Sequence, residues 1–226
     1  KIGQVKMVVN GAGAAAISCA RIYMSLGVRP GNILMCDSKG VLNTRREGLS
    51  AEKKTFVRDT PCDTLAQAIR GADVFVGLSK GGVLTPEMLL TMASDPIVFA
   101  LANPNPEIEY AQAMQTRKDI IMATGRSDTP NQINNVLGFP YIFRGALDAG
   151  ASRIDEPMKL AAAEALAELA RRPVPEELQQ LLGREDMNFG KEYIIPSPFD
   201  PRLRETIPAA VSKAAIKSGA VRKKRD

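Results

Sequence analysis

The sequence predicts a doubly wound α/β fold, a mostly parallel sheet covered by helices on both faces, with a helical appendage after it. Short apolar runs alternate with helix-like segments through the first two thirds of the chain, as in a parallel sheet with crossover helices. The first apolar run leads into a glycine turn and a helix of small residues. Later in the chain, helix-like segments replace the strands. We therefore expect a sheet domain at 1–150 and a helical appendage at 151–226 packed on it.

Five short apolar runs are expected to be the strands of this sheet, and the segments between them its helices. The strands are predicted at 5–9, 33–36, 74–77, 97–101 and 120–123, and the helices at 14–25, 64–70, 85–92 and 108–116. Boundary signals support these limits: Thr85 and Pro86 begin one helix, and Gly27 and Gly71 lie where two others should end. The long polar stretch 37–59 has room for one short helix near 50–54.

Helix signals dominate the rest of the chain. The predicted helices are 134–149, begun or broken near Pro140; 158–171; 175–182, ending at Gly183; and a last one, opened by Pro201, kinked or interrupted at Pro208 and ending at Gly219. In the helix 158–171 the apolar residues recur on one face, which is the pattern of a helix with one buried side.

The first predicted strand runs directly into a glycine turn, in the sequence VKMVVNGAGAAAI of residues 5–17. Gly11 lets the chain turn sharply, Gly13 lets the backbone approach a phosphate, and Ala16 lets the helix pack close to the strand. Helix N–H groups would then face a diphosphate. A second strand ends in Asp37 about 20 residues later, where a carboxylate can bind a ribose hydroxyl. The pattern predicts a Rossmann-type dinucleotide site; the alternative is a purely structural turn with a tight helix crossing.

Composition excludes several classes of function. The 226 residues include no histidine, which excludes histidine-based triads and most zinc sites from this chain. The longest apolar run, 97–102, is too short to span a membrane. Aromatic residues make up only 5% and are not interleaved with basic ones, so nucleic-acid binding has little support. The net charge of +5 includes the basic run 222–225, which we expect to be a solvated tail.

The three cysteines are an odd number and have no metal-like spacing. Two of them lie in apolar segments, which favours buried free thiols over disulfides. This pattern is typical of the reducing cytoplasm, and we expect a cytoplasmic protein.

Ligands of a doubly wound sheet lie outside the carboxyl ends of its strands, so the residues after each strand form the candidate site. After the second strand, Asp37 favours the 2′-hydroxyl of NAD, whereas Ser38, Lys39, Arg45 and Arg46 can receive the 2′-phosphate of NADP. The two arginines alternatively lie in a solvated loop, so the sequence leaves NAD and NADP open. All five segments that follow strands are rich in Gly, Ser, Asn or Pro: 10–14, 37–40, 77–82, 102–106 and 124–128.

Three further segments carry polar side chains suited to the rest of a cofactor and its substrate. Ser79, in the run GLSKGG, can bond the nicotinamide ribose, unless this run is a plain glycine-rich turn. Asn103 is held at a strand end by the prolines of NPNP, and its amide offers a donor and an acceptor to a carboxamide or a hydroxy acid. Of Asn134 and Asn135, one is expected to cap a helix and the other is spare. Neither a paired-carboxylate metal site nor a lysine–tyrosine pair is evident.

Longer runs carry more information than these separate motifs. They are VVNGAGAAAISCARIYMSLGV, NILMCDSKGV, ADVFVGLSKGGVLTPEML, FALANPNPEI, GRSDTPNQINNVLGFPYIFRGALD and IIPSPFDPRL. Together they resemble the NAD(P)-binding part of bacterial malic enzymes, and the resemblance extends from about residue 1 to 220. This family oxidatively decarboxylates L-malate to pyruvate and CO₂ with NAD⁺ or NADP⁺ and a divalent metal, Mg²⁺ or Mn²⁺.

The resemblance implies roles for individual residues. In the family, the catalytic tyrosine and lysine and the acidic metal ligands precede the segment with which this chain begins. The isolated chain is therefore expected to bind cofactor without turning over malate, and to hold no catalytic residue and no metal ligand of its own. The matching residues are Gly11, Ala12, Gly13, Ala14 and Ala15 in the pyrophosphate turn, Asp37 at the adenosine ribose, and Asn103 and Asn135 beside nicotinamide or malate.

Two alternatives keep the nucleotide fold but change the function. Another NAD(P)-dependent dehydrogenase, such as an amino-acid or methylene-tetrahydrofolate dehydrogenase, is not expected to carry ANPNP and PSPFDPRL together. A dinucleotide-sensing regulatory module would equally lack catalytic residues. Apolar, Met-rich helices also suggest a homo-oligomer, a dimer, and no membrane or nucleic-acid partner is expected.

Overall fold

The computed structural model describes residues 1–222 and divides them into two compact units, one ending at Thr129 and one beginning at Pro130. The first unit holds the sheet and the second is helical. The division falls earlier than the boundary after residue 150 that the sequence predicts. The reason is that the helix before residue 150 packs against the last helix of the chain. Residues 223–225 of the expected basic tail lie outside the described part.

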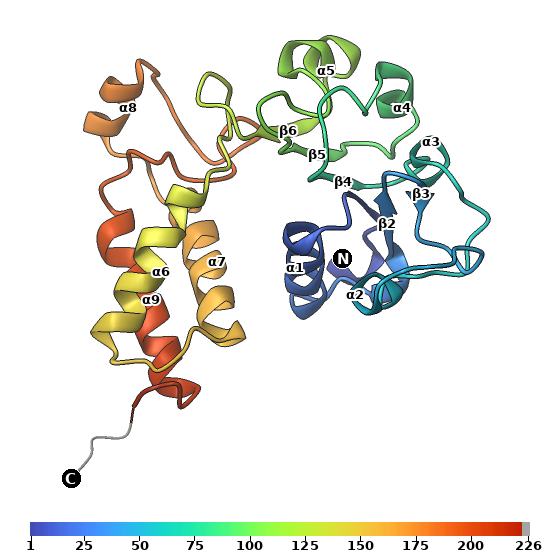
Figure 1. Ribbon diagram of the computed structural model, residues 1–226. Coiled ribbons are helices and arrows are strands. Elements are labelled where there is room, and N and C mark those ends of the chain that lie inside the picture. The colour runs from blue at the N-terminus through green and yellow to red at the C-terminus, as the bar shows by residue number, and fades with distance from the viewer. Residues whose placement is uncertain (223–226) are drawn as a thin grey trace. The chain divides into compact units, whose positions relative to one another are not determined.

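The first unit is built on a six-stranded sheet with the order β3-β2-β1-β4-β5-β6 (Figure 1). All neighbouring pairs are parallel except β2 and β3. The α/β fold class and its mostly parallel sheet are therefore confirmed. β1 lies between β2 and β4, so the strand order runs to one side of β1 for β2 and to the other side for β4. Doubly wound sheets bind their ligands at such a reversal of strand order, called the switch point. The strands are β1 (Met7–Asn10), β2 (Ile33–Asp37), β3 (Gly40–Val41), β4 (Val74–Gly77), β5 (Ile97–Ala100) and β6 (Ile121–Thr124).

The five predicted strands are all present: 74–77 has the predicted bounds, and the others have ends shifted by one or two residues. β3 was not predicted, because a strand of two residues is too short to show a hydrophobic period. It forms when the chain doubles back after β2, so that Asp37 faces Gly40 and Cys36 faces Val41 in an antiparallel pair.

The helices of the first unit follow their predicted signals. Thr85 caps one by accepting from the Met88 N–H, and Thr64 forms a reciprocal capping box with Gln67 at the start of another. Several helices are only one turn long, shorter than predicted, so the caps identified their starts better than their ends. The helices are α1 (Ala14–Ser25), α2 (Ala51–Lys54), α3 (Leu65–Ala68), α4 (Pro86–Leu90) and α5 (Tyr110–Thr116), with 3₁₀ turns η1 (Ile2–Gln4) and η2 (Pro30–Asn32).

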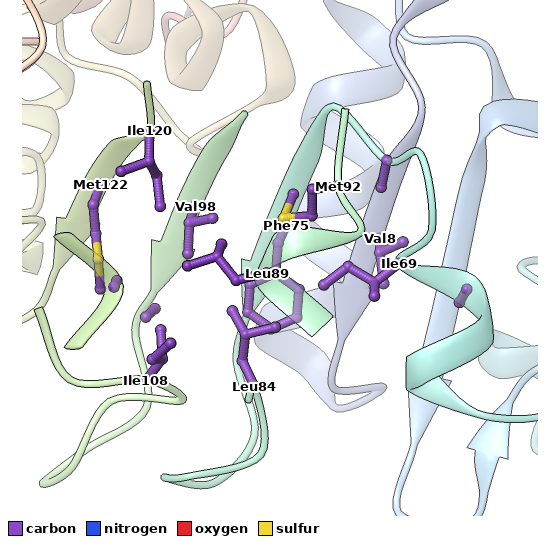
Figure 2. Packing of buried hydrophobic residues seen from close by; sticks show 14 of the residues in the cluster. Val8, Ile69, Phe75, Leu84, Leu89, Met92, Val98, Ile108, Ile120 and Met122 are labelled. Atoms are coloured by element: carbon purple, nitrogen blue, oxygen red, sulfur yellow. The ribbon is translucent and has the colours of Figure 1, made fainter. Parts of the chain in front are cut away.

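Each face of the sheet has its own hydrophobic core. On one face, Val8 and Phe75 from neighbouring strands pack with Leu89 of α4 (Figure 2). On the other face, Val9 packs in a cluster with Ala20 of α1. Successive residues of a strand point to opposite faces, so β1 contributes to both cores. Burial on both faces explains why the strands read as continuous apolar runs rather than as alternating ones.

The three cysteines are free, and Cys36 is buried while Cys19 and Cys62 are partly exposed. Burial, followed by the nearby charge of Asp37, raises the pKa of the Cys36 thiol to about 12. This thiol therefore stays protonated at neutral pH.

The second unit is a bundle in which α6 and α7 each pack against α9 (Figure 1). Gly145 permits the close approach of α6, because a Cβ there would lie 2.5 Å from the Pro208 carbonyl oxygen. α9 runs through Pro208 as one helix, so of the two predicted outcomes there, a kink or an interruption, the interruption does not occur. Pro140 lies near the start of its helix, as predicted. The elements are η3 (Asn135–Leu137), α6 (Phe139–Asp148), α7 (Glu156–Arg171), α8 (Glu176–Leu182) and α9 (Leu203–Lys217).

Among the described residues 1–222, no helix is long and apolar enough to cross a membrane.

Candidate functional site

The glycine turn after β1 has the geometry of a phosphate cradle. Gly11 has φ +130°, and a Cβ there would lie 2.5 Å from the Leu78 carbonyl oxygen, so only glycine fits. Gly13 begins α1 without any side-chain cap, and nothing lies within 4 Å of where its Cβ would be. Ala14 and Ala15 are exposed in the first turn of the same helix. The N-terminus of α1 is therefore open to an anion, which its N–H groups and dipole favour.

This turn forms one wall of a cleft of about 820 Å³ at the carboxyl ends of β1, β2 and β4. Seven of the residues predicted from the sequence line this one cleft, as the switch point of the sheet predicts. These residues are Gly11, Ala12, Gly13, Asp37, Ser38, Lys39 and Ser79.

Asp37, at the end of β2, is held by two cations. Its carboxylate accepts from Lys53 Nζ at 2.8 Å and from Arg46 at 3.1 and 3.2 Å, and one of its oxygens accepts from the Lys39 N–H at 2.9 Å. Burial alone would raise the pKa of Asp37, but the bonds from Lys53, the Lys39 backbone and Arg46 outweigh it and hold that pKa below its usual value. Asp37 is therefore a neutralised carboxylate rather than a lone acid.

The two arginines that the sequence left open have different positions. Arg46 bonds Asp37, whereas Arg45 bonds the Asp63 carboxylate at 2.6 Å and the Thr60 carbonyl. Sequence reasoning missed Lys53 as a site residue. The available signal was the expected short helix near 50–54, because Ser50 caps α2 by accepting from the Lys53 N–H.

Ser79 joins the loop after β4 to the end of β1. Its hydroxyl accepts from Asn10 Nδ2 at 2.7 Å, and its N–H donates to Glu107 Oε1 at 3.1 Å. Glu107 is fully buried, and sequence reasoning missed it. A glutamate in a proline-rich loop before a helix gives no signal of burial.

Asn103 lines a second cleft of about 760 Å³, between the loops that follow β4 and β5. Its side chain is exposed, with Nδ2 lying 3.4 Å from the Leu101 carbonyl oxygen. Ser79 and Lys80 line both clefts, so this short segment separates the glycine turn from Asn103.

Asn135 belongs to the second unit. Asn134 caps η3 by accepting from the Val136 N–H at 3.0 Å, while Asn135 is exposed and takes no part in that cap. The division of labour expected for this pair is therefore present. Asn103 and Asn135 lie in different units, and their common action on one ligand stays a prediction.

The described residues do not provide a set of ligands for a divalent metal ion. Within residues 1–222, no group of three or more aspartate, glutamate or cysteine side chains is arranged to hold a metal ion. An ion such as Mg²⁺ needs oxygen ligands in near-octahedral geometry.

The first unit has the features of a dinucleotide-binding α/β domain. These are the cleft at the switch point, the glycine turn, and the N-terminus of α1, which has no side-chain cap. Comparison with known proteins makes this assignment specific. Residues 1–182 match the family described as malic enzyme, NAD binding domain. The chain belongs to this family, and the resemblance found in the sequence is confirmed.

Relatives depend on either nicotinamide cofactor. The chain is 53% identical to the NADP-dependent malic enzyme of Halomonas elongata, over 96% of this chain and 52% of that protein. It is 49% identical to the NAD-dependent malic enzyme of Rhizobium meliloti, over 96% of this chain and 28% of that protein. The crystal structure of the Entamoeba histolytica malic enzyme matches with a TM-score of 0.85 and 35% identity, over 98% of this chain and 45% of that one. The chain thus spans about half, or less, of the relatives it matches.

Proposed function

We propose that this chain supplies the NADP-binding part of a malic enzyme, which converts L-malate to pyruvate and CO₂. The observation that carries the cofactor preference is that Asp37, which lines the cleft of the glycine turn, pairs with Arg46 and Lys53. Membership of the family favours this function over another dehydrogenase or a dinucleotide sensor.

The positive charge around Asp37 is the reason to prefer NADP. A lone carboxylate at this position repels a 2′-phosphate. Here one carboxylate faces two cations within 3.2 Å, and exposed Lys39 adds a third. Exposed Ser38 adds a hydroxyl donor. The local charge therefore favours an anion, and the 2′-phosphate is the group by which NADP differs from NAD.

The rest of the cofactor is assigned to residues that follow β4 and β5 and to Asn135. Ser79 and the loop after β4 would contact the nicotinamide ribose. Asn103, which lines the second cleft, and Asn135, in the other unit, are each assigned to the nicotinamide or malate. When bound, NADP⁺ would accept a hydride from the malate carbon that carries the hydroxyl group. The glycine turn would receive the diphosphate, through the residues Gly11, Ala12, Gly13, Ala14 and Ala15.

The chain holds no arrangement of residues for the divalent metal among residues 1–222, so no metal-dependent step is assigned to it. We infer that the metal ligands and the catalytic tyrosine and lysine come from another part of the enzyme. The isolated chain then binds cofactor but does not turn over malate. A homo-oligomer and a cytoplasmic location remain predictions.

Calorimetric titration of the chain with NADP⁺ and with NAD⁺ tests the proposal. We expect both to bind, and NADP⁺ to bind more tightly by at least about tenfold, the equivalent of one charge-assisted hydrogen bond. Tighter binding of NAD⁺ would overturn the cofactor preference. Binding of neither would overturn the site itself, and malate oxidation by the isolated chain would overturn its assignment as a cofactor-binding part only.

A further inference from the structure

Glu107 is a fully buried carboxyl group behind the loops that follow β4 and β5. Its Oε1 accepts from the Ser79 N–H at 3.1 Å, and its Oε2 accepts from the Ala102 N–H at 3.1 Å. None of the ion pairs recorded within residues 1–222 involves it. Burying a carboxyl group without a cation is costly, so its presence calls for a specific role.

The surroundings of Glu107 are shaped to admit it. A Cβ at Gly77 would lie 2.2 Å from Glu107 Cδ, so the last residue of β4 must be glycine for the carboxyl group to fit. A Cβ at Gly81 would lie 2.8 Å from the Asn105 carbonyl oxygen. The β4 side of the contact therefore lacks side chains at both points, where it meets the Glu107 carboxyl group and the Asn105 backbone.

Two backbone bonds strengthen this contact. The Gly82 N–H donates to the Pro106 carbonyl at 3.1 Å, and the Leu84 N–H donates to the Glu107 carbonyl at 3.0 Å. Together with the bond from Ser79 to the carboxyl group, they bind the segment 106–107 along the loop 79–84. The loop after β4 thus depends on the loop after β5 for its conformation.

The bonds of Glu107 also continue toward both ends of the proposed cofactor site. On one side, Ser79 accepts from Asn10 Nδ2 at 2.7 Å, and Asn10 directly precedes Gly11 of the glycine turn. On the other side, Ala102 directly precedes Asn103. Glu107 therefore lies in the middle of a connected line of hydrogen bonds that runs across the ends of β1, β4 and β5.

We infer that Glu107 is the positioning residue that sets the spacing of Ser79 and Asn103 at the nicotinamide end of the cofactor site. This inference rests on the proposed function. Both partners of Glu107 are backbone N–H donors, so the role requires two acceptor oxygens on one side chain. Glutamine supplies only one and would turn its NH₂ group against the other N–H. Glu107 itself touches no ligand and acts through the loops.

The test separates the two halves of the cofactor. The chain, its Glu107→Gln variant and its Glu185→Gln variant are titrated calorimetrically with NADP⁺ and with adenosine 2′,5′-bisphosphate, which lacks the nicotinamide half. Glu185→Gln is the matched control, since Glu185 is exposed and lines neither of the two clefts. We expect Glu107→Gln to weaken NADP⁺ binding about tenfold and to leave the affinity for the bisphosphate within about twofold. Glu185→Gln is expected to change neither affinity.

The outcomes distinguish this inference from the function on which it rests. If the unaltered chain binds neither ligand, the proposed function fails. If the chain binds both and Glu107→Gln binds NADP⁺ equally well, the positioning role is wrong. An equal loss for both ligands would mean that Glu107 serves the fold as a whole, and would also overturn the inference.

A second measurement covers the case in which Glu107→Gln does not fold. In the unaltered chain, amide hydrogen exchange is followed at Ser79 and Ala102. We expect both amides to be protected before any cofactor is added, because their N–H groups are already bonded to Glu107. If the Ser79 and Ala102 amides exchange as fast as those of an open loop, Glu107 does not hold the two loops in place before the cofactor binds, and the inference is wrong.

Discussion

Two carboxyl groups of the proposed site, those of Asp37 and Glu107, are held by opposite means. Asp37, at the ribose end, is partly accessible and is bound by the side chains of Arg46 and Lys53. Glu107, at the nicotinamide end, is fully buried and is bound by backbone N–H groups. Asp37 is surrounded by charged side chains at the edge of a cleft, and Glu107 by backbone N–H groups of two loops.

The difference teaches what each end of the site controls. Partly exposed ion pairs contribute little to folding stability, because water and salt screen them, but they set the charge that a ligand meets. A buried group with backbone partners is expensive to disturb, because its partners are left without bonds. We therefore expect changes near Glu107 to affect stability and loop geometry, and changes near Asp37 to affect which cofactor binds.

Gly77→Ala is expected to have the largest effect. Its Cβ would lie 2.2 Å from Glu107 Cδ, so either the strand or the buried carboxyl group must move. We expect a loss of about 3 kcal/mol in the free energy of unfolding, typical of overpacking a core. Urea denaturation measures it, with Gly31→Ala as control, since nothing lies within 4 Å of a Cβ at that position. Equal stability of the two variants would contradict the packing described here.

Gly13→Ala is expected to separate stability from binding. The added Cβ meets no atom within 4 Å, and the φ of −87° suits alanine, so the unfolding free energy should change by less than about 0.5 kcal/mol. The same methyl group would occupy the approach of the diphosphate, and NADP⁺ affinity should fall by at least about tenfold. Thermal unfolding and calorimetric titration on one sample measure both. Unchanged affinity would place the diphosphate elsewhere.

Arg46→Gln sharpens the ribose end of the comparison. Removing one of the two cations that neutralise Asp37 should reduce the preference for NADP⁺ over NAD⁺ by about fivefold, with little change in NAD⁺ affinity. Arg45→Gln is the matched control, because Arg45 pairs with Asp63 instead. The effect of Arg46→Gln should shrink in high salt. A similar loss in the control would mean that only the general charge of the loop matters.

The smallest effect is the pH dependence of stability that Asp37 contributes. The pKa of Asp37 is lower in the folded chain than in the unfolded one, where it is about 3.9. Its contribution is therefore fully present above about pH 4 and is lost as the pH falls through the folded value. Compared with Asp37→Asn, the unaltered chain should hold an advantage below about 1 kcal/mol at neutral pH that disappears in acid. Denaturation of both proteins from pH 7 downward measures it, and an advantage that grows in acid would contradict the assigned partners.

Sequence reasoning predicted most of the fold and several of the residues that line the cleft of the glycine turn. Gly11, Gly13 and Asp37 were identified because local rules of spacing connect them to one strand–turn–helix unit. The sequence showed that Asp37 is negatively charged and that basic residues follow it. It did not show which of the basic side chains would bind Asp37. Lys53 was missed because it reaches Asp37 from a separate short helix, across sixteen residues of chain.

Glu107 was missed for a deeper reason. Its neighbours in sequence include prolines and an exposed glutamate, and the residues that approach its carboxyl group include Gly77 and Ser79, almost thirty residues earlier in the chain. Strand β3 was missed because pairing over two residues leaves no pattern to read. The division at Thr129 depends on which helices pack together, and no local signal records that choice.

The amino-acid sequence by itself determined the α/β class, the mostly parallel sheet, the glycine turn and the family, because these depend on periodicity and on short motifs whose backbone requirements are local. The tertiary structure alone decided that Asp37 is neutralised by Arg46 and Lys53, and that Glu107 joins the loops of two strands. Both arrangements arise from contacts between residues distant in the chain, and their energies depend on burial and on distance, which no local pattern specifies.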